Sequence, residues 1–298
     1  MKNKLRTILG PAIVLVTVAA FVYYLKTHPE TVDQIRSLPP LLILVLLGLY
    51  IVVFTALLIL NIGQLMTYGK RMGWQENALF NAYSMLINFF GPGQSGPAFR
   101  GVYLKKKHDL GYKKYLFVTL IYYAFYAVLS ALMMFVGTRP WWQTLLLMAG
   151  VGAVSGFVLR LYRKRSKQAS GGGMFTPLNL GIMLGATVLQ LTTLAAIYFV
   201  ELNNVGANAS FGQVLAYTGV SNFALFAALT PGSIGIREAF LVFSQNLHGI
   251  DSSTIIAANV IDRSVYLIFL GLLFVLVLSL HAKNKLGLKS LKGNGESA

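Results

Sequence analysis

Several stretches of this chain are apolar over the length that a helix needs to cross a lipid bilayer. About 20 consecutive apolar residues span the hydrocarbon core, and hydrophobic residues make up 56% of the 298 positions against 11% charged ones. We therefore expect an all-α integral membrane protein, in which helices satisfy the backbone hydrogen bonds internally. The predicted full crossings are six and lie near residues 8–25, 39–61, 115–137, 141–160, 177–201 and 254–280.

Two further apolar stretches are interrupted by the same kind of short break, about 139 residues apart. Proline and glycine disrupt the helical hydrogen-bond ladder, and freed backbone groups are costly in lipid unless protein or water satisfies them. Paired breaks of this kind indicate a transporter-type site near the middle of the membrane. The residues that form them are Pro92, Gly93 and Gly96 in the first copy and Pro231, Gly232 and Gly235 in the second.

The basic residues predict the topology. Most of the 25 Lys and Arg residues fall in five clusters, and the positive-inside rule places such clusters on the cytoplasmic side. With six crossings, all five clusters lie on the cytoplasmic side only if residues 78–114 and 211–247 enter the membrane and return on the same side. These two segments are therefore predicted to be re-entrant broken helices. Because three crossings then separate the two breaks, the halves 38–140 and 177–280 become inverted repeats.

This topology predicts a single membrane domain that comprises residues 1–282. The domain is expected to lie in the cytoplasmic (inner) membrane, with both termini in the cytoplasm. The segment 161–176 is rich in basic residues and glycine and is expected to be a cytosolic linker between the halves. Residues 283–298 are polar and rich in Lys and Gly, which predicts a disordered cytosolic tail.

Charged residues beside the breaks are candidates for substrate binding. Arg237 and Glu238 directly follow the second break, where the free N–H groups at the start of a half-helix favour an anion. A phosphate-bearing headgroup fits such a site. Arg100 follows the first break and is the inner counterpart of Arg237. The alternative for Arg237 and Glu238 is a pair with each other at the outer interface.

The last predicted span contains a polar stripe on one helical face, formed by Asn259, Asp262, Arg263 and Tyr266. Burying the two charges costs several kcal/mol unless each is paired or faces water. We therefore expect the stripe to line a polar cavity opposite Arg237. A static ion pair that locks helices together is the alternative.

Other function classes find little support in the sequence. The chain has no Cys, and its four His residues are not spaced as metal ligands, so we expect no metal, no cofactor and no catalytic residue. The net charge of +16 follows from the cytoplasmic clusters and does not predict nucleic-acid binding. The motif G-x-G-x-x-G at 91–96 interrupts membrane helices, whereas a dinucleotide site requires a preceding strand.

At the second break and the last span the chain resembles a known family. The sequences L-T-P-G-S-I-G-I-R-E-A-F at 229–240 and D-R-S-V-Y-L at 262–267 are similar to the flippase-like membrane domain of lysylphosphatidylglycerol synthases and its stand-alone relatives. The resemblance extends over roughly residues 5–280. It implies movement of an anionic or aminoacylated phospholipid, or of an isoprenoid-phosphate lipid, between leaflets. Because the chain ends after the membrane part, it implies no aminoacyl transfer.

The expected function is therefore a lipid flippase whose partner is a membrane phospholipid, with a transferase that supplies the lipid as a further partner. Two alternatives remain at this point. One is a non-transporting membrane scaffold for a lipid-modifying or glycosyl transferase. The other is an intramembrane lipid-modifying enzyme that uses Asp262 or Glu238 as acid and base, against which the lack of a recognisable catalytic constellation argues.

Overall fold

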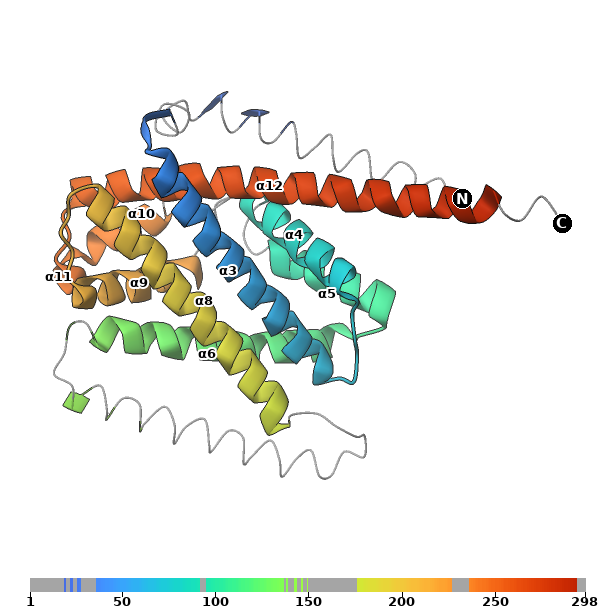
Figure 1. Ribbon diagram of the computed structural model, residues 1–298. Helices are drawn as coiled ribbons and strands as arrows, with labels where there is room; N and C mark the ends of the chain where they lie inside the picture. The colour runs from blue at the N-terminus through green and yellow to red at the C-terminus, as the bar shows by residue number, and fades with distance from the viewer. Residues whose placement is uncertain are drawn as a thin grey trace.

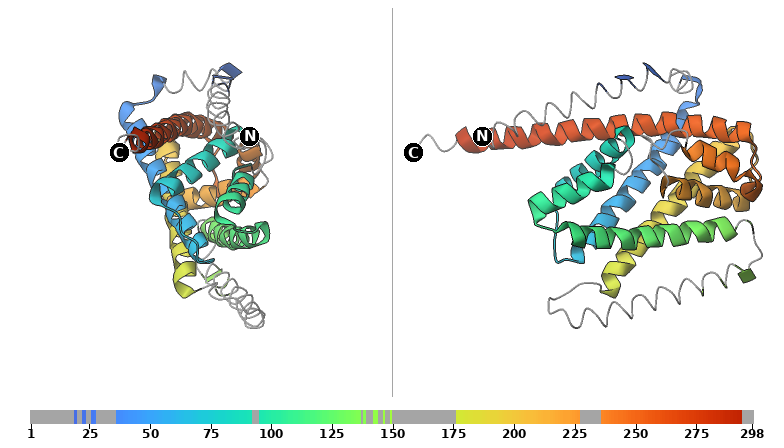
Figure 2. Two further views of the ribbon diagram at one scale, coloured as in Figure 1. Left: turned by 90° about the vertical axis from the view of Figure 1, so that its right-hand side faces the viewer. Right: turned by 180° about the vertical axis from the view of Figure 1, so that it is seen from behind.

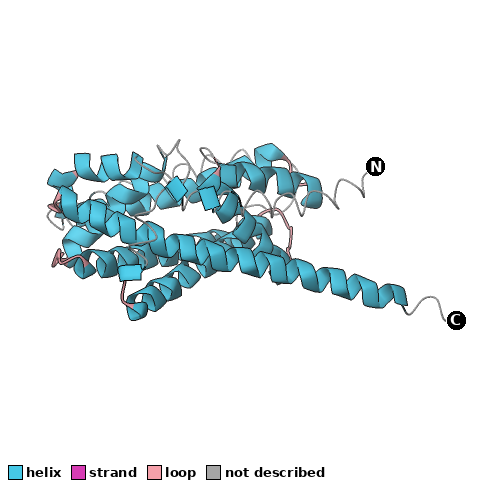
Figure 3. Cartoon of the chain, turned by 90° about the horizontal axis from the view of Figure 1, so that it is seen from above, coloured by secondary structure: helices cyan, strands magenta, loops and turns pink. Residues whose placement is uncertain are grey.

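The described part of the chain consists of helices and the loops between them. The computed structural model describes residues 36–91, 95–136, 176–226 and 236–293, with a few isolated positions between 19 and 27 and between 138 and 149. Within these residues no strand occurs, as Figure 3 shows. The helices are α3 (Pro40–Met66), α4 (Trp74–Phe90), α5 (Ser95–His108), α6 (Tyr112–Val136), α8 (Pro177–Asn204), α9 (Phe211–Phe226), α10 (Ile236–Phe243), α11 (Gln245–His248) and α12 (Ser252–Gly293).

Four helices are long and apolar enough to cross a membrane. They are α3, α6, α8 and the part of α12 from Ser252 to Leu280, and they confirm long apolar helices at the predicted crossings near 39–61, 115–137, 177–201 and 254–280. Many of their large apolar side chains are exposed, as expected of helices that face lipid. The predicted crossings 8–25 and 141–160 fall on residues that the structure describes only at isolated positions, and almost all of the linker 161–176 lies outside the described residues.

Helix α12 is longer than the span expected there. It continues to Gly293, so the boundary that we expected at residue 282 lies inside this helix. Lys and Leu, which are favourable helix formers, are frequent just beyond that position. A helix whose first turns are already packed extends readily through such residues because adding one residue costs far less than starting a helix.

The first break separates two helices that pack against each other, α4 and α5. Helix α4 ends at Phe90 before the break, whereas α5 begins at Ser95, so Gly96 belongs to the first turn of α5 and not to a loop. The Gly96 amide donates to Asn88 Oδ1 at 3.2 Å. A Cβ atom at Gly96 would lie 2.7 Å from the Ser84 carbonyl oxygen, so only glycine allows this approach. Pro92 and Gly93 lie outside the described residues.

The second break is also flanked by two helices in contact, α9 and α10. Helix α9 ends at Phe226 and α10 begins at Ile236, whereas Pro231, Gly232 and Gly235 lie outside the described residues. In Figure 1 the α4–α5 pair reaches the bundle from the end where α6 begins, and the α9–α10 pair from the end where α12 begins.

The remaining helices hold these two pairs in the middle of the bundle. Helices α3 and α8 lie side by side and run in opposite directions, and α6 and α12 lie on opposite sides of the bundle (Figure 1, Figure 2). Helix α6 packs against α9, and α12 packs against α4. Helix α6 of the first half therefore contacts the broken pair α9–α10 of the second half, and α12 of the second half contacts the broken pair α4–α5 of the first half.

Candidate functional site

An ion pair between Arg237 and Asp262 lies where five helices meet. Arg237 on α10 donates through Nη1 to Asp262 Oδ2 on α12 and through Nε to Ser221 Oγ on α9, the latter at 2.9 Å. Its guanidinium lies over the ring of Tyr198 on α8, 5.0 Å from the centroid, which favours the cation electrostatically. Tyr50 on α3 donates its hydroxyl to the other carboxylate oxygen of Asp262. The pair is thus fixed on several sides.

A second ion pair joins the same two helices. Arg263 Nε and Nη2 on α12 donate to Glu238 Oε1 on α10 at 2.8 and 2.5 Å. The Glu238 side chain is 23% exposed and that of Asp262 is 9% exposed, so the second pair is nearer the surface of the protein. The local Arg237–Glu238 pair considered from the sequence is replaced by two pairs between helices.

Several buried polar atoms around the first pair have no hydrogen-bond partner among the described residues. Buried polar groups are normally hydrogen-bonded, so a group of such atoms in one place marks where a ligand or water would find hydrogen-bond partners. Asn222 accepts from Tyr126 at 2.8 Å through its oxygen, which leaves its amide nitrogen without a partner. The atoms are Arg237 Nη2, Asn222 Nδ2, Asn259 Oδ1 and Glu201 Oε1.

Tyr266 and Asn259, which the sequence placed on one face with Asp262, contact the tyrosines of this cluster. The Tyr266 ring packs on the Tyr50 ring with centroids 5.1 Å apart. Asn259 Nδ2 donates to the Tyr217 hydroxyl at 3.2 Å, and the Tyr217 ring packs edge-on against Tyr198. The structure thus brings Asn259, Asp262, Arg263 and Tyr266 together with Arg237 and Glu238.

Arg100 lies in a separate polar cluster on the first pair of helices. Its guanidinium donates to Asn81 and lies 5.2 Å from the centroid of the Phe80 ring. Asn81 donates to Asn77 Oδ1 at 2.8 Å, which also accepts from Asn61 at 2.7 Å. Buried Arg100 Nε has no partner among the described residues. No contact of the described residues joins Arg100 directly to the Arg237–Asp262 pair.

The tyrosines of α6 lie between the two arginines. Tyr122 is within electrostatic range of Arg100, and Tyr126 is within range of Arg237. The two rings are 5.8 Å apart, and the Tyr122 hydroxyl donates to Gln190 Oε1 on α8 at 3.1 Å. Tyr122 and Tyr126 therefore connect the electrostatic surroundings of Arg100 with those of Arg237.

Six polar side chains of the site were not predicted from the sequence. The hydroxyl-bearing residues among them lie in spans whose hydropathy gives no sign of a site. Glu201 did give a signal, because it is the only acidic residue between 177 and 204, in an otherwise apolar span. The residues are Tyr50, Tyr198, Glu201, Tyr217, Ser221 and Asn222.

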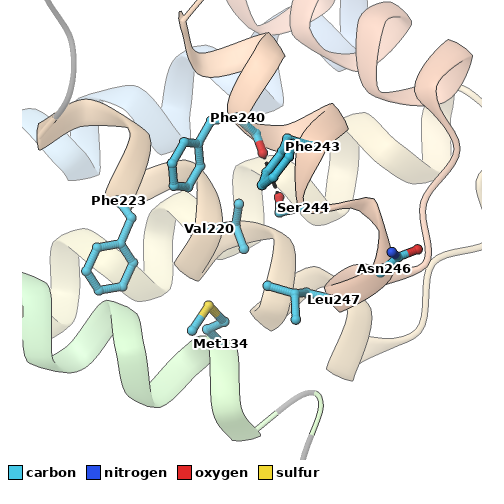
Figure 4. A pocket seen from close by; sticks show the side chains of 8 residues that line it. All are labelled: Met134, Val220, Phe223, Phe240, Phe243, Ser244, Asn246 and Leu247. Atoms are coloured by element: carbon cyan, nitrogen blue, oxygen red, sulfur yellow. Dashed lines mark hydrogen bonds between the residues drawn. The ribbon is translucent and has the colours of Figure 1, made fainter.

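An apolar groove of about 530 Å³ has none of the four paired charged residues in its lining (Figure 4). It is formed by the end of α6 together with α9, α10 and α11, and none of its lining residues is charged. Val220 and Phe223 flank Ser221 and Asn222 in the sequence of α9, so one helix contributes to both the polar cluster and the groove.

These features define a multi-pass helical membrane protein with charged pairs buried between its helices. The chain matches the family model described as the lysylphosphatidylglycerol synthase TM region over residues 7–273. It therefore belongs to this family, and the resemblance inferred from the two motifs is confirmed. A comparison with curated proteins finds no match. Among the described residues, no three His, Cys, Asp or Glu side chains are grouped to hold a metal ion.

Proposed function

We propose that this protein moves a phospholipid with an anionic or aminoacylated headgroup, or an isoprenoid-phosphate lipid, between the leaflets of the cytoplasmic membrane. The observation that carries the proposal is the combination of burial and an unused hydrogen-bond donor at Arg237. Its side chain is buried at the start of α10, and one guanidinium nitrogen has no protein partner among the described residues. A buried guanidinium that keeps a free donor at a helix start favours a phosphate oxygen.

The arrangement of the helices supports a transporter architecture. We propose that α4–α5 and α9–α10 are re-entrant and that residues 38–140 and 177–280 are inverted repeats, with both termini cytoplasmic. In such repeats α3, α4, α5 and α6 would correspond to α8, α9, α10 and α12. Most helix contacts then come in matching pairs. The contact of α6 with α9 matches that of α12 with α4, and the contact of α5 with α6 matches that of α10 with α12. Rocking of such halves about a central site is the usual route to alternating access.

A path for the headgroup follows from the two arginines. Arg100 and Arg237 each follow a break and each bind a polar side chain on the preceding helix, Asn81 and Ser221 respectively. The tyrosines of α6 lie between them and combine apolar rings with hydrogen-bonding tips. A headgroup would thus pass from one guanidinium to the other along a polar surface.

Binding would require exchange of partners at Arg237. A headgroup phosphate would take the free Nη2 donor first and then compete with Asp262 for the remaining donors. The acyl chains would stay in lipid, and the apolar groove at α9 and α10 offers one chain a surface next to the headgroup. Arg263 and Glu238, nearer the surface, would guide the headgroup into the site.

Movement of a labelled phospholipid in vesicles tests this function. Purified protein should accelerate exchange of a fluorescent phosphatidylglycerol between leaflets, and the variant Glu238→Gln/Arg263→Gln should fall to the rate of protein-free vesicles. The matched control is Lys105→Gln/Asp109→Asn, which removes a pair of the same charge types at the exposed end of α5. Equal rates in wild type and protein-free vesicles would contradict transport and favour the scaffold alternative.

A further inference from the structure

Glu201 is a buried carboxyl group that the proposed transport mechanism does not yet use. It lies near the end of α8 and is only 1% exposed. Its carboxyl group is within hydrogen-bonding reach of the Asp262 carboxyl group. Oε1 of Glu201 has no partner among the described residues. A charged carboxylate in this position would be one of the most costly groups to bury.

The groups that face Glu201 come from each helix around it. Asp262 on α12 and Arg237 on α10 are the charged neighbours, and no ion pair of the described residues involves Glu201 itself. The titratable neighbours are tyrosines from α3, α8 and α9, namely Tyr50, Tyr198 and Tyr217. The tyrosines of α6, at 122 and 126, bond to Gln190 and Asn222 instead.

The charges of the cluster balance only if one carboxyl group holds a proton. Two guanidinium groups, those of Arg237 and Arg263, face three carboxyl groups, those of Glu201, Glu238 and Asp262. Glu238 and Asp262 each form an ion pair with a guanidinium group, whereas Glu201 forms none within the described part of the chain. Two carboxyl groups that face each other in a buried site share a proton because ionising both of them there is too costly.

We propose that Glu201 and Asp262 form a proton-binding carboxyl pair. The pair holds one proton at rest, as an O–H of Glu201 that donates towards Asp262. When an anionic headgroup draws Arg237 away, Asp262 loses its counter-charge and takes up a second proton from a hydronium ion of the solvent: an O–H bond of hydronium breaks, an O–H bond to Asp262 forms, and water is released. This inference rests on the proposed function in its second step and couples binding of an anionic lipid to proton uptake.

The resting proton is tested without any lipid. Infrared difference spectra of the purified protein should contain a carbonyl band of a neutral, buried carboxylic acid that shifts in D₂O. This band should disappear in Glu201→Gln, should persist at an altered frequency in Glu201→Asp, and should be unchanged in the control Asp109→Asn, whose carboxylate is exposed. Absence of the band in wild type, or its persistence in Glu201→Gln, would overturn the proposal.

The coupled step is tested by calorimetric titration with short-chain phosphatidylglycerol in buffers of different ionisation enthalpy. We expect about one proton taken up per lipid bound by wild type and about none by Glu201→Gln/Asp262→Asn, in which neither carboxyl group of the pair remains to be protonated. Lysylphosphatidylglycerol, whose amines supply the missing positive charge, should bind with little proton uptake. Binding of phosphatidylglycerol without proton uptake would overturn the proposal. If no lipid binds, the proposed function fails, and the infrared result still decides whether Glu201 holds the proton.

Discussion

Arg237 and Asp262, 25 residues apart in the sequence, form an ion pair whose side chains are only 10% and 9% exposed. The pair connects the short helix α10, which follows the second break, to the long helix α12. Because Tyr50 donates a hydrogen bond to Asp262 and Ser221 accepts one from Arg237, α3 and α9 are tied to the same point. A ligand that separates this pair would therefore act on several helices at once.

The first prediction concerns the energy of this pair. Arg237→Gln leaves the Asp262 carboxylate buried without its guanidinium and should lower the free energy of unfolding by about 3–5 kcal/mol. Arg237→Gln/Asp262→Asn removes both charges and should be more stable than Arg237→Gln alone. Unfolding in detergent micelles measures both effects. The comparison also needs the single variant Asp262→Asn. If the losses of stability in Arg237→Gln and Asp262→Asn simply add in the double variant, the two side chains are not coupled and the ion pair has no energetic role.

A second prediction concerns the contact between α6 and α9. A Cβ atom at Gly219 would lie 2.5 Å from the Ser130 carbonyl oxygen and 2.7 Å from the Met134 nitrogen, both backbone atoms of α6. Gly219→Ala should therefore destabilise the protein by about 1–3 kcal/mol. Gly181→Ala is the matched control, because nothing lies within 4 Å of its Cβ position, and it should gain up to about 1 kcal/mol of helix stability. Equal melting temperatures for the two variants would contradict this packing.

A third prediction concerns pH and the first turn of α4. Burial alone would raise the pKa of Glu76, but hydrogen bonds from Lys107, Tyr103 and His108 outweigh burial and hold this pKa below its ordinary value of 4.5. A lowered carboxyl pKa stabilises the fold above that ordinary value, and the stabilisation is lost as pH falls through the lowered value. The melting temperature should thus drop in this acidic range, and Glu76→Gln should reduce the drop. An identical pH profile in the variant would refute the role of Glu76.

The topology gives a fourth prediction. The chain has no Cys, so single cysteines can be introduced without a background of native thiols. Lys106→Cys, at an exposed position of α5, should react with a membrane-impermeant maleimide only after the cells are opened. Asn204→Cys, at the exposed end of α8, should react in intact cells. Reaction of Lys106→Cys in intact cells would place the basic cluster outside and would contradict the re-entrant arrangement.

The sequence predicts those parts of the fold that depend on local signals. Long apolar runs predict α3, α6, α8 and α12 because a membrane helix is defined by its own length and hydropathy. Arg237, Asp262 and Arg263 are found for the same reason, since ionisable residues within apolar runs are conspicuous. The separation of helices at the first break also follows from local chemistry, although Gly96 proves to be a close-contact residue inside α5.

The choice of partners could not be predicted from the sequence. Arg237 pairs with Asp262 and not with its neighbour Glu238 because adjacent residues on a helix point in different directions, and only the packing of α10 on α12 decides which groups meet. Tyr50 and Tyr198 were missed because a tyrosine in an apolar span looks like any other large apolar residue until its hydroxyl group has a partner. Arg100 was grouped with Arg237 by analogy, whereas its contacts define a cluster of its own.

The most direct test of the central claim, that the cluster around Arg237 binds a lipid headgroup, is native mass spectrometry of the purified protein. Wild type and Lys105→Gln/Asp109→Asn should both retain an anionic phospholipid released from the membrane. Arg237→Gln/Asp262→Asn, which removes the headgroup site without leaving an unpaired buried charge, should lose this lipid. The same lipid at the same occupancy in all three proteins would contradict the claim.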